Sequence, residues 1–174
     1  MEERRPMSHV KAGLGIAGLV ILISILTMFM GGNTAQPGSG FVTYLTIIVG
    51  LIIFINLYGR ANGNQVTFGE LFSYGFKATA VYTIIFIGFL VLFSLLFPDF
   101  KNNAIEATRS QMETQKGVTE RQAAESMAIL EKYFWVFAIG ATTLFFVIVG
   151  ALGSLAGASL AKKNPKTPFD QSPT

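Results

Sequence analysis

The feature that most constrains this chain is the stretch 78–97, because it runs for 20 residues without a charged side chain. At about 1.5 Å of rise per residue, a helix of that length is roughly 30 Å long, the thickness of the hydrocarbon core of a bilayer. Composition agrees, because only 13% of the 174 residues are charged, whereas soluble domains average about 25%. The sequence therefore predicts an integral membrane protein before any motif is considered.

Apolar runs of similar character recur along the chain and predict one all-α membrane domain over residues 12–161. We expect four transmembrane helices in it, with a charged helical hairpin between the third and the fourth. Their predicted bounds are 12–32, 41–57, 76–97 and 134–161. Outside the membrane we expect a basic head, the hairpin excursion and a disordered tail, at residues 1–11, 98–133 and 162–174.

The first span has a rival interpretation, because a basic head before an apolar run is also typical of a secretory signal peptide. The apolar run here is about 20 residues long, whereas the apolar region of a signal peptide usually has about 7–15. A clean cleavage site of small residues is also lacking, since Asn33 holds the first position of Asn33-Thr34-Ala35. We therefore expect an uncleaved span.

Capping patterns predict where two helices begin. Thr67 and Glu70 have the spacing of a capping box, which predicts a helix that starts after Thr67 and continues into the third span. Thr119 and Gln122 repeat that spacing in the excursion. They predict a second hairpin helix, which we expect to run unbroken into the fourth span.

The two helices of the excursion each have a charged side and an apolar side. In the first, opposite charges follow one another at spacings of three or four and predict ion pairs along the helix, at Glu106, Arg109, Glu113 and Lys116. Ile105 and Met112, seven residues apart, mark its apolar side. The apolar side of the second helix is marked by Ala123, Met127, Leu130 and Phe134.

Small residues at four-residue spacing predict close helix contacts, because they let the backbones of lipid-embedded helices approach. They occur in the first and fourth spans, at Gly13, Ala17, Gly150, Gly153, Ser154, Gly157, Ala158 and Ala161. The first interpretation is packing within one bundle. The alternative is a homo-oligomer formed through the fourth helix.

Basic residues gather on one side of the predicted bundle. With four spans both termini lie on that side, which holds eight Lys and Arg residues against five in the excursion. The positive-inside rule then predicts cytoplasmic termini and an external hairpin. Seven of the eight are also candidate contacts for lipid headgroups, namely Arg4, Arg5, Lys11, Arg60, Lys77, Lys162 and Lys163.

Little in the sequence predicts chemistry. Apart from Lys77 at the edge of the third span, the four spans contain no ionisable residue, which argues against proton-coupled pumps, carboxylate-driven exporters and voltage sensors. His9 is the only histidine and there is no cysteine, so no metal site, cofactor or cysteine nucleophile is expected. The small net charge of +3 is explained by topology and gives no sign of nucleic-acid binding.

Three segments together carry a family resemblance. They are TFGELFSYGFK at 67–77, FPDF at 97–100, and the end of the fourth span from GALG at 150–153 to AKK at 161–163. On them the chain resembles the uncharacterised bacterial membrane family known as domain of unknown function 4199, over residues 11–163. The resemblance implies a four-helix protein of the bacterial inner membrane and brings no catalytic residues.

Two functions remain open from sequence. The first is a non-catalytic protein that assembles with itself or with a partner, using the hairpin at 98–133 and the Gly153 face. The second is a small oligomeric transporter or channel. It would need a shared polar lumen, for which the candidate residues are Thr43, Thr46, Thr79 and Thr83. An enzyme acting on lipid would need an acid–base set that is not recognisable here.

Overall fold

The computed structural model describes residues 6–29, 40–114 and 119–164, and within them it contains six helices and no strand. Four of the helices are long and apolar enough to cross a membrane. The helices are α1 (His9–Phe29), α2 (Phe41–Ala61), α3 (Phe68–Leu96), α4 (Asp99–Thr114), α5 (Glu120–Lys132) and α6 (Phe134–Leu160). The predicted all-α membrane fold with four spans is confirmed.

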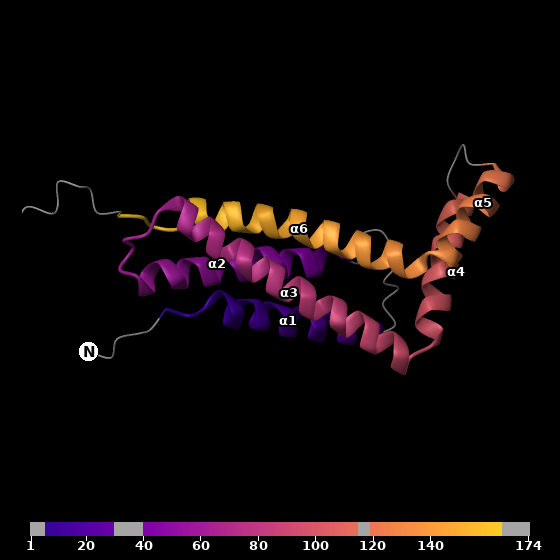
Figure 1. Cartoon of the computed structure of the whole chain (residues 1–174), viewed down its shortest axis with the longest axis horizontal. Coiled ribbons are helices and arrows are strands. Elements are labelled where there is room, and N and C mark those ends of the chain that lie inside the picture. The colour runs from indigo at the N-terminus through magenta and orange to yellow at the C-terminus, as the bar shows by residue number, and fades with distance from the viewer. Residues whose placement is uncertain (1–5, 30–39, 115–118, 165–174) are drawn as a thin grey trace, which may run out of the picture.

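The spanning helices form one elongated bundle (Figure 1). Helix α3 packs against both α1 and α6, while α2 packs against α1, α3 and α6. The described chain begins and ends at the same end of the bundle, and the α4–α5 hairpin lies at the other (Figure 1). We call these the terminal end and the hairpin end. The predicted head at 1–5, the turn at 33–39, and the tail from 165 onward lie outside the described residues.

The buried core is concentrated toward the terminal end. In α3 the buried residues run from Leu71 to Thr83, and in α6 the main group runs from Phe146 to Ala158. Beyond Thr83, α3 continues for 13 residues to Leu96, or about 20 Å, without another fully buried side chain. Helices α3 and α6 diverge over this half (Figure 1). The hairpin end is therefore the more loosely packed half.

Both predicted capping boxes are present. Thr67 Oγ1 accepts a hydrogen bond of 3.2 Å from the backbone N–H of Glu70, and Glu70 Oε2 accepts one of 2.7 Å from the backbone N–H of Thr67. Thr119 and Gln122 make the same reciprocal pair at the start of α5. As predicted, α3 then runs on from its cap as one continuous helix.

The prediction that α5 continues unbroken into α6 is wrong. Helix α5 ends at Lys132 and α6 begins at Phe134, with Tyr133 between them at φ −113° and ψ 25°. The chain changes direction there (Figure 1). The cause is packing, because Met127 and Phe134 are buried against Ile105 of α4. That contact folds α5 back along α4, while α6 must follow the axis of the bundle.

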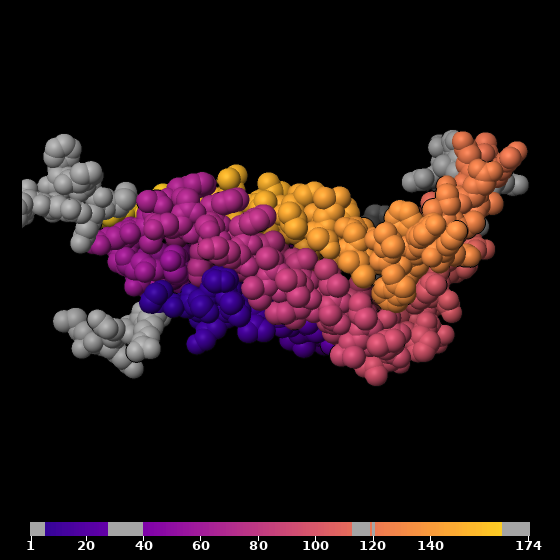
Figure 2. Space-filling view, viewed as in Figure 1, coloured from indigo at the N-terminus to yellow at the C-terminus, as the bar shows by residue number. Residues whose placement is uncertain are grey.

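The hairpin is held together, and against the start of α6, by a small second apolar cluster. Ile105, Met127 and Phe134 form its centre, with Met112 and Leu130 packed around them, as their spacing predicted. Arg109 forms an ion pair of 3.0 Å with Glu131 of α5, across the hairpin rather than along α4 toward Glu106. Figure 2 shows the hairpin extending sideways past α6. The side chains at 113–118 lie outside the described residues.

Candidate functional site

The small residues predicted to mediate packing all lie inside this bundle. A methyl group added at Gly13 would meet Val81 and Ala78 of α3, and one at Gly150 would meet Thr79 and Tyr82 of the same helix. On the α2 side, Gly153 lies against Leu51 and Ile48, and Gly157 against Ile55 and Ile52. The remaining four are also buried, namely Ala17, Ser154, Ala158 and Ala161. A dimer formed through these residues would have to displace α2 or α3.

Polar side chains in the middle of the bundle mostly bond to backbone. The Tyr82 hydroxyl donates to the carbonyl of Phe146 at 3.1 Å, and Thr79 donates to the carbonyl of Gly75 at 3.0 Å. Thr46 donates within α2, and Thr43 beside it is half-buried. Thr83 is buried and its hydroxyl has no partner among the described residues.

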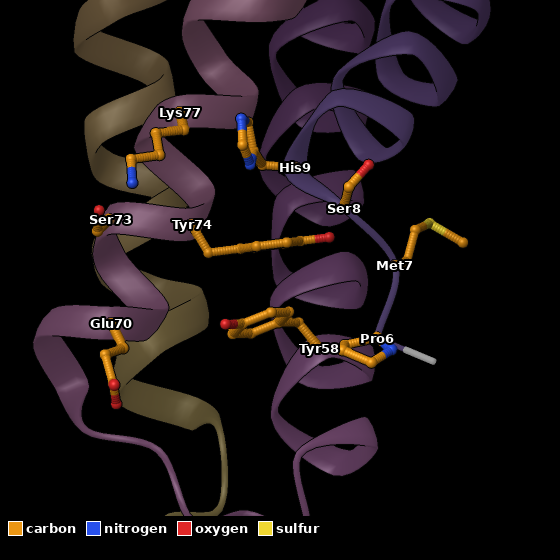
Figure 3. Close-up of a pocket in the computed structure, with 9 residues that line it drawn as sticks. All are labelled: Pro6, Met7, Ser8, His9, Tyr58, Glu70, Ser73, Tyr74 and Lys77. Atoms are coloured by element: carbon orange, nitrogen blue, oxygen red, sulfur yellow. The ribbon is translucent and has the colours of Figure 1, made fainter. Parts of the chain in front are cut away.

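A polar pocket lies at the terminal end, where three helix ends meet. It has a volume of about 180 Å³ and is lined by the N-terminal segment before α1, by the last turns of α2 and by the first turns of α3. Figure 3 shows the nine lining residues: Pro6, Met7, Ser8, His9, Tyr58, Glu70, Ser73, Tyr74 and Lys77. None of the four threonines of the predicted lumen is among them.

Two tyrosines form the wall between α2 and α3. The rings of Tyr58 and Tyr74 stack with centroids 4.2 Å apart and planes 18° from parallel. Their hydroxyls point in opposite directions, and that of Tyr74 points toward the segment carrying Met7 and Ser8 (Figure 3). Tyr74 is only 6% exposed, and its hydroxyl is buried without a hydrogen-bond partner among the described residues. Such a group costs about 1–3 kcal/mol if nothing satisfies it.

Ser8 and His9 bring the start of α1 to the pocket. The backbone N–H of Lys11 donates to Ser8 Oγ at 3.3 Å, so Ser8 caps α1 in the way common at helix starts. His9, the first residue of the helix, lies on the Lys77 side of the tyrosine stack (Figure 3). The start of a helix carries a partial positive charge, which favours an anionic group beside it.

Glu70 and Lys77 bring opposite charges to the pocket. They stand seven residues apart on α3 and lie at opposite edges of it (Figure 3). Among the described residues neither has an ion-pair partner within 4.0 Å. Glu70 is held by Thr67, which donates to Oε2 through both its backbone N–H and its hydroxyl, at 2.7 and 3.0 Å. The sequence predicted Glu70 as the capping-box partner of Thr67 and Lys77 as a candidate contact for lipid headgroups.

The other predicted headgroup contacts lie elsewhere. Lys163 Nζ bonds to the carbonyls of Ala158 and Ser159 at 2.6 and 3.3 Å, so it caps α6. Lys11, Arg60 and Lys162 are exposed, and Arg4 and Arg5 lie outside the described residues. The described part of the chain contains no cluster of three His, Cys, Asp or Glu residues that could hold a metal ion.

A protein-family model described as a protein of unknown function (DUF4199) matches residues 11–163 of the chain. The chain belongs to the DUF4199 family. In this DUF4199 protein the matched region includes the hairpin and the α2 and α3 residues of the pocket, whereas residues 6–9 precede it. Comparisons with curated proteins and with solved structures gave no significant match.

Sequence reasoning missed the pocket because its parts are far apart in the chain. Tyr58, Tyr74 and His9 come from three different helices, and each alone has an ordinary explanation as an interfacial residue. A usable signal was present in retrospect. Tyr58 follows one apolar run, while Glu70 and Lys77 precede the next. The short connection between the two helices therefore brings their polar ends together.

Proposed function

We propose that this DUF4199 protein is a non-catalytic assembly protein of the bacterial inner membrane, and that its α4–α5 hairpin binds another protein. The observation that carries the proposal is the compact packing of the hairpin at the end of the bundle. Its apolar cluster around Ile105 and Met127 is completed by Phe134, the first residue of α6, and an ion pair between Arg109 and Glu131 joins its two helices. A module folded in this way can present a fixed surface beyond the membrane.

The outward surface of the hairpin contains the features of a binding face. Arg121 and Glu125 pair at 3.0 Å on the exposed side of α5. Ile129, one turn further along, is 53% exposed although it projects from an extramembrane helix. We take this exposed apolar residue, flanked by charged groups, as the centre of the proposed contact with a protein partner.

A non-catalytic role agrees with the residues available. The pocket holds one histidine, one glutamate and one lysine, and the glutamate and the lysine lie at its opposite edges (Figure 3). The alternative of an oligomeric channel has less support, because Thr79 lies against Gly150 of α6 and Thr46 bonds within α2. A common lumen would require these threonines to face the same opening.

The proposed orientation places the termini in the cytoplasm and the hairpin outside, following the eight basic residues against five. Single cysteines test it cleanly because the chain has none of its own. Asn103→Cys lies on exposed α4 and Gln65→Cys on the exposed α2–α3 turn. A membrane-impermeant maleimide added to spheroplasts should label the first and leave the second unmodified. The reverse pattern would refute the orientation.

The partner is tested by crosslinking in intact cells. A photo-crosslinking amino acid at Arg121 should give a discrete adduct, and Ile129→Ser in the same chain should abolish it because the apolar contact is lost. The matched control places the crosslinker at Gln65, at the opposite end of the bundle. If the Arg121 adduct is absent, or survives Ile129→Ser unchanged, the hairpin is not the binding surface that we propose.

A further inference from the structure

The pocket at the terminal end lies at the depth of lipid headgroups. On each of its three helices, the pocket residues stand just outside the apolar run. His9 precedes the run that starts at Ala12, Tyr58 follows the one that ends at Leu57, and Lys77 precedes the uncharged stretch of α3. Paired tyrosines at that level are also typical of the membrane interface. The pocket is therefore placed where a headgroup resides.

The chemistry of the pocket fits a phosphate group on one side. Lys77 supplies a cation that has no ion-pair partner among the described residues. The capped start of α1 adds partial positive charge beside His9. The buried hydroxyl of Tyr74, which has no acceptor among the described residues, points toward the segment that carries Met7 and Ser8, beside the start of α1 (Figure 3). A phosphate placed between these groups can accept from His9 and Tyr74, and the long, exposed side chain of Lys77 can turn toward it.

The opposite edge of the pocket fits an ammonium group. Glu70 Oε2 accepts two hydrogen bonds from Thr67, and a carboxylate has about four acceptor positions, so capacity remains. Glu70 and Lys77 are seven residues apart, or about 10.5 Å along the helix axis, which suits a group carrying separated charges. The volume of about 180 Å³ is below the roughly 300–1,000 Å³ of drug-sized sites. It suits a headgroup rather than a whole molecule.

We propose that this pocket binds the headgroup of a zwitterionic phospholipid, with the phosphate against Lys77, His9 and Tyr74 and the ammonium against Glu70. The acyl chains then run along the outer faces of the helices, where Leu14 is 52% exposed one turn deeper than the pocket. The site and the hairpin lie at opposite ends of the bundle (Figure 1). Loss of lipid binding would therefore leave the partner crosslink of the hairpin unchanged, and the two proposals fail separately.

The test uses the full chain, stripped of lipid in detergent, with native mass spectrometry and melting temperature as readouts. The probes are dioctanoyl phosphatidylethanolamine, dioctanoyl phosphatidylglycerol, dioctanoylglycerol and inorganic phosphate. We expect the first to bind and to raise the melting temperature, since a ligand that binds only the folded state stabilises it. Tyr74→Phe and Lys77→Gln should each weaken its binding about tenfold, the effect of losing one hydrogen bond to a charged group.

Two controls separate the site from general effects. Arg60→Gln removes an exposed cation at the same end of the bundle but outside the pocket, and should bind the lipid like the wild type. Tyr74→Phe keeps the ring that stacks on Tyr58 and removes only an unpartnered hydroxyl. Its lipid-free melting temperature should equal or exceed that of the wild type, so weaker binding cannot be attributed to misfolding.

Each remaining outcome overturns the assignment. Equal binding of phosphatidylglycerol would show that the ammonium is not recognised, and equal binding of dioctanoylglycerol that the phosphate is not. If inorganic phosphate displaces the bound lipid when the two are present at equal concentrations, the ligand is a soluble phosphate. If Tyr74→Phe and Lys77→Gln both bind the lipid like Arg60→Gln, the lipid site lies elsewhere on the protein.

Discussion

Gly13 is a position where a single added methyl group would meet atoms that cannot move aside. A Cβ atom added there would come within 2.7 Å of Val81 Cβ and 2.9 Å of the carbonyl oxygen of Ala78. Both atoms are fixed to the backbone of α3, so no side-chain rotation can make room. Gly18, five residues along the same helix, has no atom within 4 Å of its added Cβ. The two positions are therefore a matched pair.

The comparison of the two variants isolates the contact. Replacing glycine by alanine inside a helix gains about 0.5–1 kcal/mol in either case, through the lower entropy of the unfolded chain. Gly18→Ala should show this gain alone. Gly13→Ala must also separate α1 from α3, and overpacking of this kind costs about 1–3 kcal/mol. The difference between the variants should therefore be about 1–3 kcal/mol, with Gly13→Ala the less stable.

The free energy of unfolding can be measured by titrating dodecyl sulfate into a mild detergent and following helicity by circular dichroism. Wild type and both variants should be measured at equal protein and micelle concentrations, so that the differences reflect the chain. A Gly13→Ala variant that is as stable as Gly18→Ala would refute the close approach of α1 and α3. A loss in both variants would instead contradict the assumption that Gly18 faces open space.

Four further experiments have defined outcomes. A double-mutant cycle of Arg109→Ala and Glu131→Ala should give a coupling of only about 0.2–1 kcal/mol, because both side chains are 48% exposed. Tyr82→Phe should lower the unfolding free energy by about 1 kcal/mol, since it removes a buried hydrogen bond to a carbonyl of α6. Ser154→Ala should leave the unfolding free energy unchanged or raise it, because the buried hydroxyl of Ser154 has no partner among the described residues. Lys163→Ala should cost about 0.3–1 kcal/mol through loss of the cap on α6, and hydrogen exchange should rise at the last turn of that helix.

Local signals in the sequence predicted the structural features that depend on residues close together in the chain. The capping box of Thr67 and Glu70 fixed the start of α3, because both partners lie within one turn. The number of membrane spans followed from the length of the apolar runs alone. The interruption at Tyr133 could not be predicted in this way, since its cause is a contact with Ile105, almost 30 residues earlier in the chain.

The pocket marks the same limit more clearly. Its wall requires Tyr58 of α2 to stack on Tyr74 of α3, and another side requires the segment before α1 to lie beside them (Figure 3). Neither relation is encoded in the spacing of residues along one helix. A glutamate and a lysine seven residues apart cannot pair on a helix, so pattern analysis treats them separately. Only the packing of three helices makes them two edges of one site.

The distribution of small and large residues accounts for the asymmetry of the bundle. Gly13 and Gly150 allow α3 to approach α1 and α6 toward the terminal end, and that half holds the buried core and the pocket. Toward the hairpin end, α3 instead has a series of phenylalanines whose rings contact one another, with Phe89, Phe93 and Phe97 at centroid distances of 5.5 and 4.6 Å. These rings pack on one another along α3, and Gly88 and Gly140 have no atom within 4 Å of an added Cβ, which agrees with the divergence of α3 and α6 in this half (Figure 1). The chain thus combines a tightly packed end, suited to holding a ligand in fixed geometry, with a looser end from which the hairpin projects.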